Sequence, residues 1–473
     1  MLKIIVAREW QTIWRSKTLT AGWLFLLIML GIAFAGTQQQ VTRLAQQRAM
    51  ADSLFRYQWT QLKAENPHSA AHFGTYIYKP VSTLSVFDNG IHHFSGYTLR
   101  VEAHVQHMLA AAPATPADNY LRFGEFSMAT VLQLFFPLLI IFFCYNSYVQ
   151  EREQGTLKIL LLQGAGNRLL LTGKALSGLL ISNAMLLVSL VIFFSILFLF
   201  NKFHSNTDVT AACLLMLAYA VYASILVLCC IIISFLSKTG RQALIILLGA
   251  WLAGAVLIPR MAATAGNILY PLPSWYELQE SISRAEKFGI DGKEPREQRQ
   301  EKLTAAWLKK YHVKTVNELP VNFDAIQMQA AEEYMQQIYD RHIAAIDSII
   351  RHQNNIIGYA AILNPYLAIQ HVSMGLSGSD YQHHAHFFAA ARLYRNNFIR
   401  RLNEQLAYGG SKTGDHNWKA DAAFFRKMPV FKYRPPSLQA VLLQQLPYIA
   451  LLIAWLLAGY LLLIRLSSNE SVI

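Results

Sequence analysis

Six runs of residues that contain no Asp, Glu, Lys, Arg or His place the strongest constraint on this chain. They cover residues 19–36, 126–148, 175–200, 210–236, 243–259 and 441–464. About 20 apolar residues in a helix are enough to cross roughly 30 Å of bilayer hydrocarbon. Inside a bilayer, a helix satisfies its own backbone polar groups. We therefore predict an all-α polytopic membrane protein with six transmembrane helices.

Composition and cysteine use agree with a membrane protein. Of the 473 residues, 54% are hydrophobic, and these residues gather in blocks. The four cysteines, Cys144, Cys213, Cys229 and Cys230, all fall within the apolar runs. A free thiol in such a setting behaves as a small hydrophobe, and no disulfide framework is indicated.

The lysines and arginines in the short loops indicate the orientation. If the N-terminus is cytosolic, the cations of four segments lie on the cytosolic side, which is where such residues are enriched. These segments are residues 1–18, 149–174, 237–242 and 465–473. We therefore expect a multi-pass protein of the inner (plasma) membrane with both termini in the cytosol.

The N-terminal segment has two interpretations. Residues 1–18 place Leu2, Val6 and Trp10 on one helical face, which is typical of a helix that lies in the membrane interface. The rival interpretation is a cleaved signal peptide, because Ala33-Phe34-Ala35 resembles a signal-peptidase site.

Two long segments then face outside, so the fold class includes two extracytoplasmic, mainly helical insertions. They cover residues 37–125 and 260–438. Residues 75–78 favour a strand, whereas apolar spacing predicts helices over 323–357 and 381–406. We expect 260–438 to form a self-folding helical cap that selects or hands over cargo.

A polar island at residues 149–174 separates the second and third apolar runs. Leu157, Leu160 and Leu161 share one face, whereas Glu153 and Lys158 lie elsewhere on the turn, so a short amphipathic helix is predicted. The end of the island is not a phosphate-binding loop. Six residues rather than four separate Gly166 from Gly173, and Ala175 replaces the required Ser or Thr.

The island carries a family resemblance. Glu151-x-x-x-Gly155-Thr156-Leu157, followed by Gly173-Lys174, resembles the cytoplasmic signature of ABC-2 type transporter permeases. In that family the segment is a coupling helix held in a groove of a separate ATP-binding subunit. The resemblance implies that the ATPase-coupling residues are Glu151, Glu153, Gly155, Thr156, Leu157, Lys158, Arg168 and Lys174.

Other segments resemble one branch of this family, which has a large uncharacterised periplasmic domain before the last transmembrane helix. The similar segments are His72-Phe73-Gly74 through Pro80, Asn364-Pro365 and Tyr394-Arg395. The resemblance then covers nearly the whole chain, but it does not identify the substrate.

The implied function is that of a membrane permease subunit that moves an unidentified substrate across the inner membrane. The chain has no expected catalytic residue and binds no cofactor directly, so ATP and Mg would act through the partner ATPase. The other implied partners are membrane lipid, a second permease chain, identical or related, and a periplasmic or outer-membrane protein. The sequence contains no His-Glu-x-x-His and no Gly-x-Ser-x-Gly motif.

Two alternatives to the permease function stay open. The chain could be a membrane-anchored scaffold or assembly protein that binds a periplasmic partner, or another multi-spanning protein with a charged cytosolic loop. A nucleic-acid partner is not expected. Although the net charge is +13, the cations flank the apolar runs or are dispersed among acids.

Metal binding is a further possibility in the outer segments, which together with the short outer loop at residues 201–209 contain all 15 histidines. Imidazole suits zinc, copper and nickel. His104 and His107 could share an ion at i and i+3, and His383 and His386 have the same spacing. The competing interpretation is that these histidines lie on an ordinary solvated helix surface.

Overall fold

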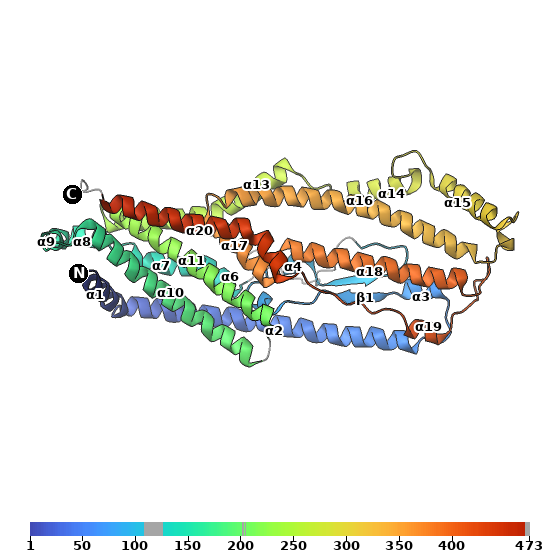
Figure 1. Ribbon diagram of the computed structural model, residues 1–473, viewed down its shortest axis with the longest axis horizontal. Helices are drawn as coiled ribbons and strands as arrows, with labels where there is room; N and C mark the ends of the chain where they lie inside the picture. Colours follow the sequence, from blue (N-terminus) through green and yellow to red (C-terminus); the bar gives the residue numbers. More distant parts are fainter. Residues whose placement is uncertain (108–125, 201–202, 204, 469–473) are drawn as a thin grey trace.

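The computed structural model describes residues 1–107, 126–200, 203 and 205–468 as an elongated molecule (Figure 1). Both termini lie at one end, which we call the proximal end, together with α1, α8 and α9. The opposite half, which we call the distal region, contains α3, β1, β2, α14, α15, α16, α18 and α19. The all-α class predicted from the sequence is confirmed, since the described sheet has only two short strands.

Among the residues that the structure describes, six helical segments are long and apolar enough to cross a membrane, as predicted. They are α2 (Lys17–Gln61), the segment Met128–Glu153, α10 (Asn167–Leu199), α11 (Asn206–Leu236), the segment Gly240–Leu269 and α20 (Leu438–Ser468). The second segment consists of α6 (Met128–Thr130), a π-helical turn η2 (Val131–Phe135), α7 (Phe136–Cys144) and α8 (Val149–Glu153). The fifth consists of α12 (Gly240–Leu252), a π-helical turn η3 (Ala253–Leu257) and α13 (Ile258–Leu269).

The remaining described elements lie at the proximal surface, in the distal region or, as α17 does, against the membrane helices. They are α1 (Leu2–Trp14), α3 (Pro67–Phe73), β1 (Thr75–Tyr78), η1 (Thr83–Val86), α4 (His92–Ser95), β2 (Thr98–Val101), α9 (Thr156–Leu162), α14 (Trp275–Phe288), α15 (Arg296–Tyr311), η4 (Val316–Glu318), α16 (Phe323–Ala360), α17 (Pro365–Ser377), α18 (Tyr381–Tyr408) and α19 (Ala422–Arg426).

The first membrane helix continues far beyond the apolar run. α2 has 45 residues, and at 1.5 Å per residue it is about 70 Å long, more than twice the thickness of the hydrocarbon. Ser16 caps its N-terminus by accepting a hydrogen bond from the backbone N–H of Leu19. The second half of α2 therefore reaches the distal region and forms one of its walls (Figure 1).

Two membrane helices contain a π-helical turn before a proline. η2 precedes Pro137, and η3 precedes Pro259. Proline lacks a backbone N–H, and its ring clashes with the carbonyl four residues earlier. A π turn changes the hydrogen-bond register at that point, so the helix continues past the proline.

The distal region is built from long helices and a small sheet. β1 pairs antiparallel with β2, with Thr75 opposite Val101 and Tyr78 opposite Thr98, so the strand predicted at 75–78 is confirmed. The helices α16 and α18 begin at the predicted residues and pack together. Trp59 of α2 is buried in the same core as Phe387 and Phe398 of α18.

The segment 260–438 is not separate from the membrane helices. Leu367, Ile369 and Val372 of α17 are buried in one core with α10, α11 and α20. The Tyr219 hydroxyl of α11 also donates a hydrogen bond to Ser373 Oγ at 3.0 Å. The expectation of a self-folding cap is therefore wrong for α17, because this helix buries its apolar residues against the membrane bundle.

Candidate functional site

The polar island forms two short helices rather than one. α8 ends near Gln154, and α9 begins after Gly155, which has a left-handed backbone conformation with φ of +74°. Glycine adopts this conformation without the steric cost that a Cβ would add. The Thr156 hydroxyl donates to Glu151, both to the backbone carbonyl and to the carboxylate. The Gly155-Thr156 turn therefore fixes the angle between α8 and α9.

A buried ion-pair network holds α8 against two other helices. Lys174 Nζ of α10 lies 2.6 Å from Glu9 Oε1 of α1 and 3.3 Å from Glu151 Oε1 of α8. Arg8 adds a longer contact to Glu151 at 3.8 Å. Only 4% of Lys174 and 7% of Glu151 are exposed, so solvent screens these charges weakly. We name Glu9, Glu151 and Lys174 the proximal triad.

The neighbouring residues of α8 bind the ends of two membrane helices. Arg152 donates to the carbonyl of Ser237 at 2.7 Å and to that of Phe235 at 3.2 Å, at the C-terminus of α11. Glu153 Oε1 accepts from the backbone N–H of Gly240 at 3.1 Å, at the N-terminus of α12. Charges of these signs complement the dipoles at those helix ends. α8 is therefore tied to α1, α10, α11 and α12.

The outward face of α9 is apolar and solvent-accessible at the proximal end of the molecule (Figure 1). Leu162 is 89% exposed and Ile159 is 56% exposed, and Lys158 lies on the exposed surface beside them. Leu157, in contrast, is buried in the membrane core. A leucine exposed to this extent on a rigidly held helix is a natural contact for a partner protein.

The structure divides the predicted coupling residues into two groups. Glu151, Leu157 and Lys174 lie inside, whereas Glu153, Gly155, Lys158 and Arg168 are exposed and Thr156 is half-buried. The direct contact of Glu151 and Leu157 with an ATPase stays a prediction, and in the described residues both side chains make internal contacts.

Sequence reasoning did not identify Arg8, Glu9 and Arg152 as members of this site. A signal for Glu9 was present, since it is the only acidic residue before Asp52. An isolated acid on a basic, apolar segment next to a membrane indicates a structural partner.

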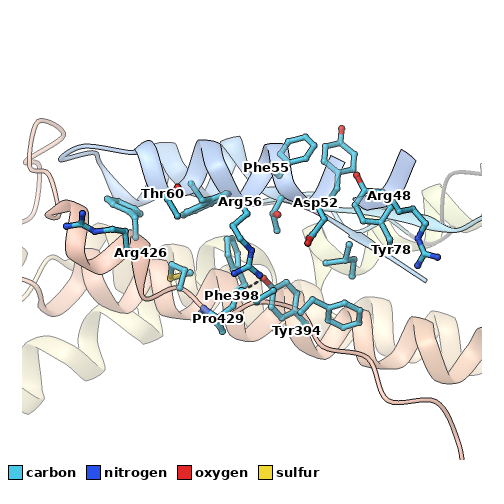
Figure 2. A pocket seen from close by; sticks show the side chains of 18 of the residues that line it. Arg48, Asp52, Phe55, Arg56, Thr60, Tyr78, Tyr394, Phe398, Arg426 and Pro429 are labelled. Carbon is cyan, nitrogen blue, oxygen red and sulfur yellow. Dashed lines mark hydrogen bonds between the residues drawn. The ribbon is translucent and has the colours of Figure 1, made fainter. Parts of the chain in front are cut away.

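A second candidate site is a cavity of about 340 Å³ in the distal region. Figure 2 shows Arg48, Asp52 and Arg56 of α2 on one side and Tyr394 and Phe398 of α18 on the other. The Tyr394 hydroxyl donates to the carbonyl of Pro429 at 2.8 Å, which holds the chain after α19 across the cavity. The lining combines arginines with aromatic side chains, and such a combination suits an anionic group attached to an apolar body.

The predicted histidine pairs are not brought together as expected. His104 and His107 lie after β2, outside any helix, and His107 contacts Glu102 at 3.0 Å. His383 contacts Asp380 at 2.7 Å, whereas His386 contacts the Tyr433 hydroxyl at 3.0 Å. The i, i+3 pairs therefore use separate partners, because His104 and His107 do not lie on a helix and His383 points inward.

His104 instead contacts a buried ion pair between α16 and α18. Its Nδ1 lies 3.1 Å from Glu332 Oε1, and Arg395 lies 2.8 Å from Glu332 Oε2. Burial alone would raise the pKa of Glu332, but hydrogen bonds from His104 and the charge of Arg395 together lower it to about 2. Glu332 is therefore an anion at neutral pH.

Comparison with known protein families gives two matches. Residues 99–251 match the family described as ABC-2 family transporter protein, and residues 276–434 match a domain of unknown function, DUF3526. No curated protein matches the chain. The first match and the six apolar helices of the described residues support a multi-pass permease of an ABC transporter. The chain carries an ABC-2 family transporter domain at residues 99–251 and an additional DUF3526 domain at residues 276–434.

Proposed function

We propose that this chain is the membrane subunit of an ABC-2 type transporter and moves its substrate across the inner membrane with energy from ATP hydrolysed by a separate subunit. The ATPase would bind the outward face of α9, and both termini would lie in the cytosol. ATP and Mg would be bound by that partner. The single observation that carries the proposal is the exposed apolar face of α9, which follows a helix, α8, that is bonded to α1 and to three membrane helices.

The contacts between α8 and the membrane helices support a role for α8 in transmitting movement from the ATPase to those helices. Movement of α9 by an ATPase would be transmitted through the proximal triad to α1 and α10. It would also be transmitted through Arg152 and Glu153 to the facing ends of α11 and α12. Buried, hydrogen-bonded ion pairs with defined geometry transmit displacement because they have few alternative arrangements.

A second permease chain is part of this proposal. In α11, half of the most apolar stretch of 18 residues is buried. In Gly240–Leu269 and in α20, only 11% of the corresponding stretch is buried. These two segments therefore present apolar surface outward, to lipid or to a second chain. Six helices with two of them at the periphery support a permease made from two such chains.

The test uses affinity-purified full-length chain from its native membranes. We expect vanadate-sensitive, Mg-dependent ATP hydrolysis to copurify with the wild type. Leu162→Asp should reduce the copurified activity at least tenfold, because truncation or charge at a central contact typically costs 2 kcal/mol or more.

The matched control is Leu393→Asp, which changes a leucine with 62% exposure on distal α18. It should retain wild-type ATPase. Equal activity in the Leu162→Asp preparation would refute the α9 contact. If no ATPase activity copurifies with the wild type, the alternative of a membrane-anchored scaffold is favoured instead.

A further inference from the structure

Three histidines converge on one point in the distal region. His68 and His72 are four residues apart on α3, so they share one face of that helix. His104 approaches from the segment after β2. One ring nitrogen from each histidine can be chosen so that all three atoms lie within 4.8 Å of one another. The Nε2 atoms of His68 and His72 are 3.1 Å apart.

The backbone holds these rings in place before any ligand binds. Asn66 caps α3 by accepting from the backbone N–H of His68, and its amide donates to the carbonyls of His416 and Trp418. The backbone N–H of Ala103 donates to the carbonyl of Ala71 at 3.0 Å, which joins the segment after β2 directly to α3. The site therefore does not depend on a flexible loop.

His104 has a specific orienting partner. Its Nδ1 and its backbone N–H both contact Glu332 Oε1, at 3.1 and 2.6 Å. His104 also has a φ of +60°, a left-handed conformation that is uncommon and sterically unfavourable for residues other than glycine. The two contacts to Glu332 offset that cost. With Nδ1 occupied by the carboxylate, Nε2 is the ring nitrogen left for a ligand.

The carboxylate is itself fixed. Arg395 binds Glu332 Oε2 at 2.8 Å and also donates to the carbonyl of Val105 at 3.2 Å. These contacts therefore link Arg395, at the buried interface of α16 and α18, through Glu332 to His104, whose side chain is 47% exposed. A carboxylate that orients a histidine in this way is the usual outer support of a metal-binding imidazole.

We propose that His68, His72 and His104 bind one divalent transition-metal ion on the surface of the distal region. Zinc is the ion to test first, with copper and nickel as competitors, because neutral imidazole suits all three metals. Calcium and magnesium are not expected, since they prefer oxygen ligands. Three protein ligands leave a fourth position for water or an exchangeable ligand, as in open zinc sites.

Exposure is consistent with exchange rather than with a closed structural site. His72 and His104 are exposed and His68 is half-buried, so an ion can enter from solvent. The competing interpretation is a hydrogen-bonded cluster of surface histidines. That arrangement accounts for the contact between His68 and His72, and the zinc titration below distinguishes it from a metal site.

The test measures zinc binding to full-length, detergent-purified protein that carries no polyhistidine tag. After chelator treatment, zinc is titrated against a chromophoric competitor. We expect one site per chain in the wild type that His72→Ala or His104→Ala weakens at least 100-fold. Glu332→Gln should weaken zinc binding by 10- to 100-fold, which is the usual effect of losing an outer support.

His107→Ala is the matched control, because His107 lies three residues from His104 but contacts Glu102 instead. It should bind zinc like the wild type. Cobalt provides a readout of geometry, since a tetrahedral three-histidine site should give intense visible absorption that His72→Ala removes. Zinc should also raise the melting temperature of the wild type but not of His104→Ala.

The proposal would be overturned if His72→Ala and His104→Ala, with melting temperatures near that of metal-free wild type, bound zinc as tightly as the wild type. It would equally be overturned if the wild type showed no zinc binding that these substitutions weaken. Neither outcome depends on the ATPase, so the proposed transport function is tested separately.

Discussion

The proximal triad and the distal pair of Glu332 with Arg395 have similar electrostatic arrangements but different proposed roles. Glu151 and Glu332 are each 7% exposed, and each bridges a buried cation and a more exposed basic side chain. At Glu151 the buried cation is Lys174, which binds a second carboxylate, and the network closes around three helices. At Glu332 the buried cation is Arg395, and the outer partner is a solvent-exposed imidazole.

The comparison shows that a buried carboxylate does not define a function by itself. The third member of each network decides the outcome. Glu9 completes a junction between helices at the proximal end, whereas His104 presents a ring beside two other imidazoles at the distal end. One network is suited to transmitting force, and the other is suited to holding a ligand.

The largest effect is expected from Lys174→Met. This change leaves Glu9 and Glu151 buried without their shared cation, and breaking a buried ion network typically costs about 3–5 kcal/mol. We expect a value near the top of that range, measured by thermal unfolding of the purified protein in detergent. Lys158→Met, on the exposed face of α9, is the control and should change the free energy of unfolding by less than about 0.5 kcal/mol.

Arg395→Met should have the next largest effect, about 3–4 kcal/mol, because Glu332 would keep only its contacts to His104. The matched control is Arg400→Met. Arg400 pairs with Glu333 between the same two helices, but both side chains are 45% exposed, and such pairs contribute about 0–1 kcal/mol. Equal losses in the two variants would show that burial does not distinguish these pairs.

A third test of buried charge concerns Lys79, a buried lysine whose Nζ lies 3.2 Å from Nδ1 of the His92 imidazole. Burial lowers the pKa of Lys79 from 10.5 to about 8. Between these values the unfolded chain binds more protons, so the free energy of unfolding should rise from pH 8 to 10.5. At about 1.4 kcal/mol per pKa unit, the rise is roughly 3 kcal/mol.

The measurement for Lys79 is denaturant unfolding at several pH values, compared with Lys79→Met. The variant should lack this increase. An increase of the same size in both proteins would assign the pH dependence to other groups.

The smallest effect is expected from Gly155→Ala. The position is open, with no atom within 4 Å of an added Cβ, but φ is +74°. The left-handed conformation should therefore cost about 1 kcal/mol and should reduce copurified ATPase activity if the angle of α9 matters. An added Cβ at Gly166 also meets no atom within 4 Å, and φ there is negative. Gly166→Ala should therefore leave the stability and the copurified ATPase activity unchanged.

Local pattern was enough to predict much of this architecture. The uncharged runs located all six membrane helices, and apolar spacing located the starts of α16 and α18. The strand at Thr75–Tyr78 was also predicted, because alternation is visible within a few residues. The sequence of 260–438 did not reveal that α17 joins the membrane core, because its apolar residues would suit either the distal region or the membrane bundle.

The two candidate sites depended on tertiary structure to different degrees. The polar island and the signature that resembles the family's lie in one short stretch, so the sequence by itself located the segment that we propose binds the ATPase. Only the tertiary structure decided that Glu151 and Lys174 face inward, because Glu9 lies 165 residues before Lys174. The three-histidine cluster was beyond sequence reasoning, since His104 is oriented by Glu332, 228 residues away. Hydropathy and periodicity are local properties of a chain, whereas the partner of a buried charge is chosen by how distant helices pack.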